Sequence, residues 1–95
     1  GPKGKGKVDF GVKGYIAKSS WNFNPSKSGY GKVIIELCLN KDGSIKSVKH
    51  VLGGTMTDKY FIDLAIKAVK TNTYQSMGAS DSETCGKVTF NIKAQ

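Results

Sequence analysis

The sequence predicts an α+β domain, in which a β-hairpin and a later strand form a small antiparallel sheet with one helix packed on one face. Three stretches of the chain support this fold class. Residues 31–52 alternate in polarity around a turn, residues 55–71 carry apolar side chains at helical spacing, and residues 87–93 alternate again. With 95 residues, the chain has the length of a single domain with one modest core.

The hairpin is the clearest of these elements. Its first strand places one set of side chains on one face and another set on the opposite face, and the segment Asn40–Gly43 supplies the Asp-Gly pair that tight turns favour. In the returning strand, Ser44–Leu52, the apolar residues Ile45 and Val48 are three positions apart, which predicts a bulge or a strong twist. The apolar face consists of Val33, Ile35, Leu37 and Leu39, and the other face of Lys32, Ile34, Glu36 and Cys38.

A helix is expected after the Gly53-Gly54 pair and runs to about Thr71. Thr55 and Asp58 have the spacing of a capping box, and Thr57 is the alternative cap. Either choice leaves Asp58 near the positive end of the helix dipole. The apolar residues recur at helical spacing and predict one core-facing stripe, made of Phe61, Leu64, Ala65, Ala68 and Val69.

The last strand is predicted to have one buried and one polar face, so that the sheet is covered on one side only. Its inward residues are Val88, Phe90 and Ile92, and its outward residues are Lys87, Thr89, Asn91 and Lys93. We expect Phe90 to pack between Leu37 of the hairpin and the helix face at Leu64 and Ala65.

The remaining segments carry weaker signals. Residues 1–10 are rich in glycine and lysine and are interpreted as a flexible linker that holds one anchor, Phe10, so the domain itself spans residues 11–95. Residues 12–17 are expected to form a short strand. Four aromatic or apolar side chains are expected to pack against the core from the connecting segments: Trp21, Phe23, Tyr74 and Met77.

The chain is basic, with a formal net charge of +8, and all of its cations are lysines. One interpretation is a solvated basic tail, and the other is contact with an anionic polymer. Arginine, the usual bidentate reader of bases and phosphates, is absent, so we favour the first interpretation and expect no nucleic-acid partner. The first eighteen residues hold five of the lysines: Lys3, Lys5, Lys7, Lys13 and Lys18.

The sequence offers no constellation typical of an enzyme. His50 is the only histidine, and it lies in a strand without an identifiable Ser, Cys or carboxylate partner. Asp42, Asp58 and Asp63 are explained by the turn, the cap and the helix surface, which leaves no carboxylate pair for acid–base chemistry. No glycine-rich phosphate loop is present, and two cysteines with one histidine cannot complete a zinc quartet. We therefore expect no catalysis, no cofactor and no metal.

What remains is a sheet edge. A three-stranded sheet has two edge strands, and each offers unpaired N–H and C=O groups to a partner. The last strand ends in lysines, which discourage indiscriminate pairing. We expect a partner peptide to add as a further strand along this edge, whose residues are Gly86, Lys87, Val88, Thr89, Phe90, Asn91, Ile92 and Lys93.

These segments, in this order, resemble the C-terminal periplasmic domain of the TonB energy-transducer family. Residues 31–45 (GKVIIELCLNKDGSI) are similar to the family's hairpin, residues 54–61 (GTMTDKYF) and 64–69 (LAIKAV) to its helix, and residues 86–92 (GKVTFNI) to its last strand. The resemblance covers about residues 29–93. The proline that often follows the helix is absent from the segment Tyr74-Gln75-Ser76, and the two cysteines are not part of the family's pattern.

The resemblance implies a function in active import. A region absent from this chain would anchor the protein in the inner membrane and contact proton-driven motor proteins. The present domain would lie in the periplasm and bind the N-terminal box of an outer-membrane receptor by β-strand addition. It also leaves open a strand-swapped homodimer. Two other classes remain as alternatives: a basic module that binds an anionic polymer, and a small inhibitor that contacts its target through Asn40–Gly43.

The two cysteines are either free thiols or one disulfide. If the first and last strands are antiparallel neighbours, placing Glu36 opposite Lys87 also places Cys38 opposite Cys85, and opposite charges across two strands favour that register. A periplasmic location permits oxidation. We therefore predict a disulfide between Cys38 and Cys85.

Overall fold

The structure, a computed structural model, describes residues 7–93 and confirms the α+β fold class. Its elements, in order, are β1 (Lys7–Gly11), β2 (Tyr15–Ala17), β3 (Gly31–Asn40), β4 (Ile45–Val51), α1 (Lys59–Thr71), β5 (Tyr74–Ser76) and β6 (Glu83–Ile92). No helix in the described part of the chain has the length and apolarity needed to cross a membrane.

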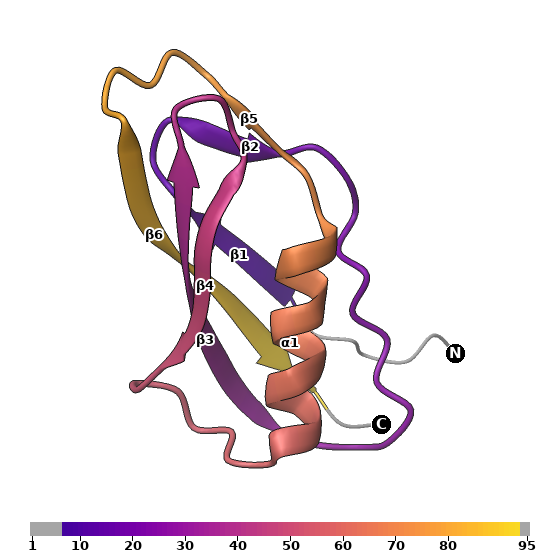
Figure 1. Ribbon diagram of the computed structural model, residues 1–95. Helices are drawn as coiled ribbons and strands as arrows, with labels where there is room; N and C mark the ends of the chain where they lie inside the picture. The colour runs from indigo at the N-terminus through magenta and orange to yellow at the C-terminus, as the bar shows by residue number, and fades with distance from the viewer. Residues whose placement is uncertain (1–6, 94–95) are drawn as a thin grey trace.

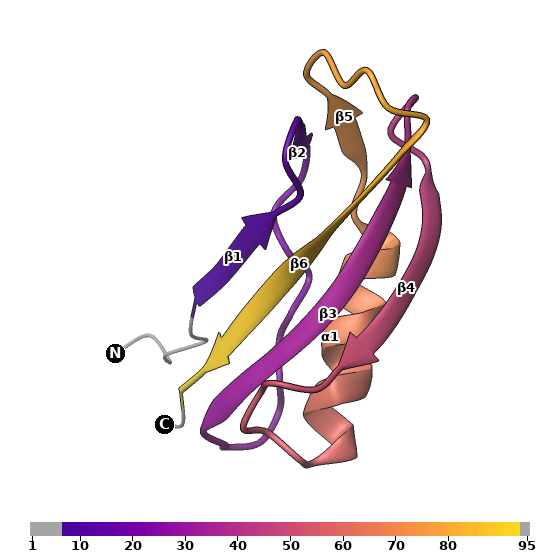
Figure 2. The ribbon, with the colours of Figure 1, turned by 90° about the vertical axis from the view of Figure 1, so that its left-hand side faces the viewer.

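The strands labelled in Figure 1 include those of the main sheet, which is antiparallel and has the order β1-β6-β3-β4, as Figure 2 shows. β6, although last in sequence, is an inner strand. α1 lies on one face of the sheet, and the other face is open (Figure 2). β2 and β5 pair separately at the end of the molecule where the β3–β4 hairpin turns.

The inner face of the sheet carries the core. Side chains from β3 and β6 are fully buried there, and two different segments cover them. α1 lies over β3 and β4, whereas Trp21 and Phe23, from the connection between β2 and β3, cover the half that contains β6. The sheet residues with no exposed surface are Val33, Ile35, Leu37, Leu39, Val88 and Phe90.

The expected position of Phe90 beside Leu37 was wrong, although its burial was right. Phe90 lies opposite Val33 in the register, not beside Leu37. Its ring centroid is 5.0 Å from that of Phe23 and 5.9 Å from that of Trp21. Because α1 is displaced toward β4, the aromatic segment fills the place that the sequence assigned to the helix.

The hairpin agrees with its prediction in faces and irregularity. The β3–β4 register shifts between Cys38 and Leu39, where one extra residue of β4 forms the expected bulge. Gly43 in the turn has a φ of 93°, a conformation that favours glycine. A Cβ on Gly43 would also lie 2.5 Å from the carbonyl oxygen of Tyr74, so the hairpin tip is packed against β5.

The helix has its predicted apolar stripe but a different cap. Phe61, Ala65, Ala68 and Val69 are buried, and Leu64 is partly buried. The Asp58 carboxylate caps the helix by accepting a hydrogen bond from the Tyr60 N–H at 2.9 Å. The proposal that Thr55 or Thr57 is the cap was wrong, because the Thr55 hydroxyl instead accepts the Lys32 N–H at 3.0 Å and Thr57 is exposed.

Asp58 also has a pKa below its ordinary value. The hydrogen bond from Lys27, whose Nζ lies 2.9 Å from Oδ2, is the main cause, and the Tyr60 N–H is the second. A carboxyl group whose pKa falls on folding stabilises the protein above its unfolded pKa and loses this contribution as the pH falls through its folded pKa. The ordinary value is 3.8, so the stabilisation is present above this pH and is lost as the pH falls below it toward the lowered pKa of the folded state.

We therefore expect Asp58→Ala to lower the melting temperature at pH 7, because it removes both the cap and the ion pair. The matched control is Asp63→Ala, which loses only an exposed ion pair with Lys59 and should have a smaller effect. Scanning calorimetry from pH 7 to pH 2.5 measures both variants. Equal melting temperatures for Asp58→Ala and the unmodified chain at pH 7 would contradict the capping role.

Two assignments outside the regular elements also change. The predicted linker was too long, because residues 7–10 belong to β1. Residues 1–6 lie outside the described residues. Met77 is 58% exposed and is not a core anchor, unlike Tyr74, which is buried. The short strand expected within residues 12–17 is confirmed as β2, which begins at Tyr15.

Candidate strand-docking site

The expected edge strand is not an edge. β6 pairs with β3 on one side and with β1 on the other, where Lys87, Thr89 and Asn91 lie opposite Gly11, Asp9 and Lys7. The expectation that residues 86–93 present an open edge was therefore wrong, because both sides of β6 are already paired. The physical reason is that the chain supplies a strand of its own from the segment taken for a linker. The outer strands of the described sheet are β1 and β4.

The Cys38–Cys85 pair shows which main-chain N–H and C=O groups of β6 point toward β1. Opposite residues in an antiparallel ladder are about 4.5 Å apart at Cα when they share no hydrogen bonds and about 5.5 Å apart when they do. The Cα atoms of Cys38 and Cys85 are 4.0 Å apart, so the N–H and C=O of Cys85 point away from β3. The β3–β6 register is uninterrupted, so every second residue does the same. The main-chain groups that face β1 belong to Lys87, Thr89 and Asn91.

The apolar side of β1 sits against aromatic rings. Phe10 stacks on Tyr74 with a centroid distance of 5.6 Å and an interplanar angle of 11°, and it also lies 6.1 Å from Trp21. Trp21 in turn meets Phe90 edge to face. Val8 and Phe10 are nevertheless only partly buried. The rings of Trp21 and Tyr74 therefore form a socket, which Phe10 fills.

Tyr74 is the fixed wall of this socket. Its hydroxyl donates a hydrogen bond of 2.7 Å to the carbonyl oxygen of Val69 at the end of α1. Burial raises the pKa of Tyr74 well above its ordinary value of 10.0, so the hydroxyl stays protonated and remains a donor. The Tyr74 side chain is thus also held by a hydrogen bond that does not involve β1.

The polar side of β1 is held by exposed contacts. The Asn91 side-chain amide donates to the Lys7 carbonyl oxygen and to Asp9 Oδ2, each at 3.3 Å. Lys7 and Asp9 form an ion pair with each other at 3.7 Å, and their side chains are 79% and 57% exposed. Exposed pairs of this kind contribute little to stability.

The C-terminal end of β1 is built into the fold. A Cβ on Gly86 would overlap the Gly11 carbonyl oxygen and lie 2.7 Å from the Val12 Cα, so the chain crosses β6 in direct backbone contact. Val12 is buried, and the Tyr15 hydroxyl donates to the Asn40 carbonyl oxygen at 3.0 Å. The chain is therefore fixed from Val12 onward.

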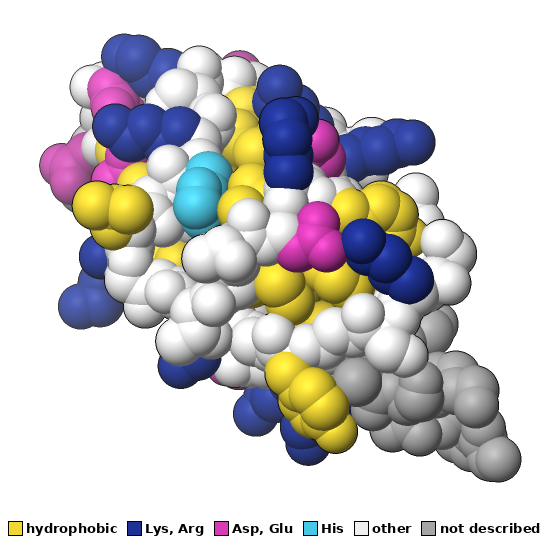
Figure 3. All heavy atoms as spheres, turned by 90° about the horizontal axis from the view of Figure 1, so that it is seen from below, with side chains coloured by type: hydrophobic (Ala, Val, Ile, Leu, Met, Phe, Trp, Pro, Cys, Tyr) yellow, Lys and Arg dark blue, Asp and Glu magenta, His cyan; other side chains and the backbone are white. Residues whose placement is uncertain are grey.

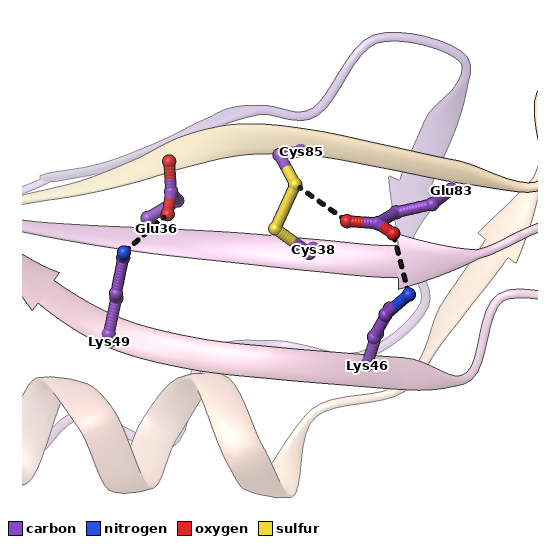
Figure 4. The surroundings of a disulfide bond; sticks show 6 residues. All are labelled: Glu36, Cys38, Lys46, Lys49, Glu83 and Cys85. Atoms are coloured by element: carbon purple, nitrogen blue, oxygen red, sulfur yellow. Dashed lines mark hydrogen bonds and ion pairs between the residues drawn. A yellow bond between two sulfur atoms is a disulfide. The ribbon is translucent and has the colours of Figure 1, made fainter.

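The β4 edge is protected by lysines that reach across the open face of the sheet. Figure 4 shows Lys46 beside Glu83 and Lys49 beside Glu36. The Nζ–Oε1 distance is 2.7 Å in the Lys46–Glu83 pair and 3.5 Å in the Lys49–Glu36 pair. Lysines along an outer strand oppose unspecific strand pairing. The β4 edge is therefore the less suited of the two for a partner strand.

The same face carries the disulfide, in the predicted register of Glu36 opposite Lys87 and Cys38 opposite Cys85 (Figure 4). The bond joins the two inner strands of the sheet. Glu83 Oε2 lies 3.4 Å from Cys85 Sγ. Cys38, Cys85 and Glu83 could together hold a metal ion only as thiolates and carboxylate, and in the disulfide neither sulfur is a thiolate.

Other sequence candidates are not brought together. His50 is exposed on β4 opposite Ile35, and no hydrogen bond or ion pair joins it to the described residues. Exposed apolar side chains occur at both ends of the molecule. Tyr30 and Leu52 lie where β3 begins and β4 ends, the end viewed in Figure 3, where lysine side chains surround separate apolar patches. Ile16 and Met77 lie at the β2–β5 end.

One element of the site was missed by sequence reasoning. Residues 7–11 alternate polar and apolar side chains, with Val8 and Phe10 on one face and Lys7 and Asp9 on the other. This alternation is the signal that could have identified β1. No protein-family model matches the chain, and neither a curated protein nor a solved structure matches it significantly. Function is therefore argued from the residues themselves.

Proposed function

We propose that this chain is a protein-interaction domain of a TonB-type energy transducer, which binds the N-terminal box of an outer-membrane receptor by β-strand addition. The observation that carries the proposal is the pairing of β6 with β1. β6 receives a separate short strand, in antiparallel register, at the position where the resemblance expects the strand of the receptor. This side of β6 is thus able to accept an added strand.

The architecture suits a domain that transmits a pull. A partner strand held along Lys87, Thr89 and Asn91 would share a load across several main-chain hydrogen bonds, each contributing about 0.5–1.5 kcal/mol net. The disulfide joins β6 to β3, so the load would pass from the docking strand to the rest of the sheet through a covalent bond. A disulfide also suits the oxidising periplasm in which such a domain works. In this proposal, other parts of the protein would supply the membrane anchor and the motor contacts.

The inhibitor alternative has less support. An inhibitory loop must project from its scaffold, whereas the hairpin tip is packed against its own domain. Gly43 is buried beside Tyr74, and the Lys41 N–H donates to the Ser82 carbonyl oxygen at 3.1 Å. The anionic-polymer alternative is also less favoured, since five lysines of the described residues are engaged in ion pairs within the domain.

The test uses peptides from the N-terminal segments of outer-membrane receptors of the same organism. On titration into the ¹⁵N-labelled chain, we expect amide shift changes in residues 86–93 and in β1. Thr89→Pro should abolish binding, because its N–H points toward the docking side and proline removes that donor. Phe90→Pro is the contrasting variant, since its N–H pairs with β3 and its loss should damage the fold. Shift changes confined to Asn40–Gly43 or to scattered lysines would overturn the proposal.

A further inference from the structure

We infer that β1 is a resident strand, which occupies the docking site in the unbound chain and is displaced when a partner's extended segment binds. The inference rests on the proposed function and adds how the site is regulated and which segment fits it. In the unbound state, Lys7, Asp9 and Gly11 satisfy the main-chain groups of β6. A partner must compete with this tethered strand, whose effective concentration is high because it belongs to the same chain.

The attachment of β1 is suited to release. β1 has five residues, and none of them is fully buried. Its side-chain contacts are the partly exposed stack of Phe10 on Tyr74 and the exposed polar contacts of Lys7 and Asp9. Segments with few buried contacts and exposed backbone hydrogen bonds open before the rest of a protein.

A hinge lies at the junction with the fixed part of the chain. Val12 is buried and Gly86 admits the backbone of Gly11 in close contact, so release must stop at this point. Gly11 has the widest backbone freedom of any residue type and stands between the two parts. Lys7–Phe10 can therefore swing out while the chain from Val12 onward stays in place.

The site that β1 leaves would keep its shape. β6 remains paired with β3 along its whole length and is bonded to it by the disulfide. Tyr74 remains tied to α1 through its hydroxyl, and Trp21 remains against Phe90. The docking strand and the aromatic socket are thus preformed, which reduces the entropy cost of binding.

The side chains of β1 indicate which partner segment fits. The inward positions take a small apolar residue where Val8 lies and an aromatic residue where Phe10 fills the socket. The outward position between them takes an acidic residue, as Asp9 does, because the Asn91 amide donates to it and Lys87 lies one pair further along. The partner is therefore an extended protein segment with the pattern apolar, acidic, aromatic.

Two proline variants separate displacement from simple addition. The N–H of Asp9 pairs with β6, so Asp9→Pro should release β1, whereas the N–H of Val8 points outward, so Val8→Pro should leave β1 docked. The probe is a fluorescent peptide of residues 6–12 (GKVDFGV), and anisotropy measures its binding. We expect Asp9→Pro to bind the probe at least about tenfold more tightly than the unmodified chain or Val8→Pro. A probe carrying Phe10→Ser should bind at least about tenfold more weakly to Asp9→Pro.

Phe10→Ser in the full chain is a second way to loosen β1 and should also raise affinity for the probe. If neither variant binds the probe more tightly than the unmodified chain, β1 is not displaceable and the inference is wrong. If Val8→Pro abolished binding of the probe, the added strand would instead lie on the outer edge of β1. The unmodified chain could instead form a dimer at higher concentration, and Asp9→Pro could prevent it. That result would mean that β1 pairs with a second copy of the chain, and it would also overturn the inference.

Hydrogen exchange tests the same idea without a ligand. Amides of β1 in the unmodified chain should exchange at least about tenfold faster than those by which β3 and β6 pair with each other. Equal protection in all three strands would mean that β1 opens only on global unfolding. Failure of the proposed function alone would give a different result. Receptor peptides would then bind neither the unmodified chain nor Asp9→Pro, whereas the probe would still bind Asp9→Pro.

Discussion

Phe90→Ala is expected to lower the free energy of unfolding by about 3–5 kcal/mol. The ring has no exposed surface and lies against Phe23 and Trp21, so truncation removes buried contacts and leaves a cavity beside two rigid rings. Urea unfolding followed by tryptophan fluorescence measures the loss, because the single tryptophan lies next to the mutated site.

Phe10→Ala is the matched aromatic control. Phe10 is partly exposed and belongs to β1, so its truncation should cost clearly less than that of Phe90. Similar losses for the two variants would mean that β1 is as integral to the core as β6, which would count against a displaceable β1. A loss below about 1 kcal/mol for Phe90→Ala would show that β6 is not seated on the sheet as described.

Removal of the disulfide is the second large effect. The bond closes a loop with a sequence separation of 47 residues, and the chain-entropy relation assigns such a loop about 4 kcal/mol of stabilisation. The double variant Cys38→Ser, Cys85→Ser should lose about this amount, measured by denaturant unfolding. Reduction of the unmodified chain with a dithiol is the control, because it opens the bond without placing a hydroxyl at the buried position of Cys38.

The double variant and the reduced chain should lose similar amounts of unfolding free energy, and they should differ only by the small cost of burying the serine hydroxyl. An unchanged unfolding midpoint on reduction would contradict the entropic role of the bond. Titration of two free thiols in the oxidised, folded chain would contradict the bond itself.

The elements that could be predicted from sequence are those with a regular period. Val33 to Leu39 alternate over a long strand, Phe61 to Val69 repeat at helical spacing, and both segments keep that pattern in the fold. The disulfide register followed from pairing Glu36 with Lys87, a local rule of antiparallel sheets. The strand and helix patterns are contained within short stretches of sequence, whereas the disulfide register also required the assumption that the first and last strands are neighbours.

The features that were missed depend on contacts between distant residues. β1 has only five residues beside a glycine- and lysine-rich segment, and its partner β6 lies near the other end of the chain, so composition favoured a linker. Trp21 and Phe23 were expected to pack against the core, but the sequence did not indicate that they would lie over Phe90. Residues 86–93 were expected to form an open edge, and the strand β1 that already pairs with them could not be inferred from β6 alone.

The inner position of β6 has a consequence for how the chain is made. β6 is the last described strand to be synthesised, yet both β1 and β3 pair with it. Until residues 83–92 have been synthesised, β1 has no partner strand among the described elements and β3 can pair only with β4. Before β6 is made, β1 lacks its partner strand and Trp21 and Phe23 lack the Phe90 ring that they cover, and exposed apolar side chains of this kind favour aggregation. We expect the sheet to close, and the cysteines to become available to each other, only when the whole domain has been released.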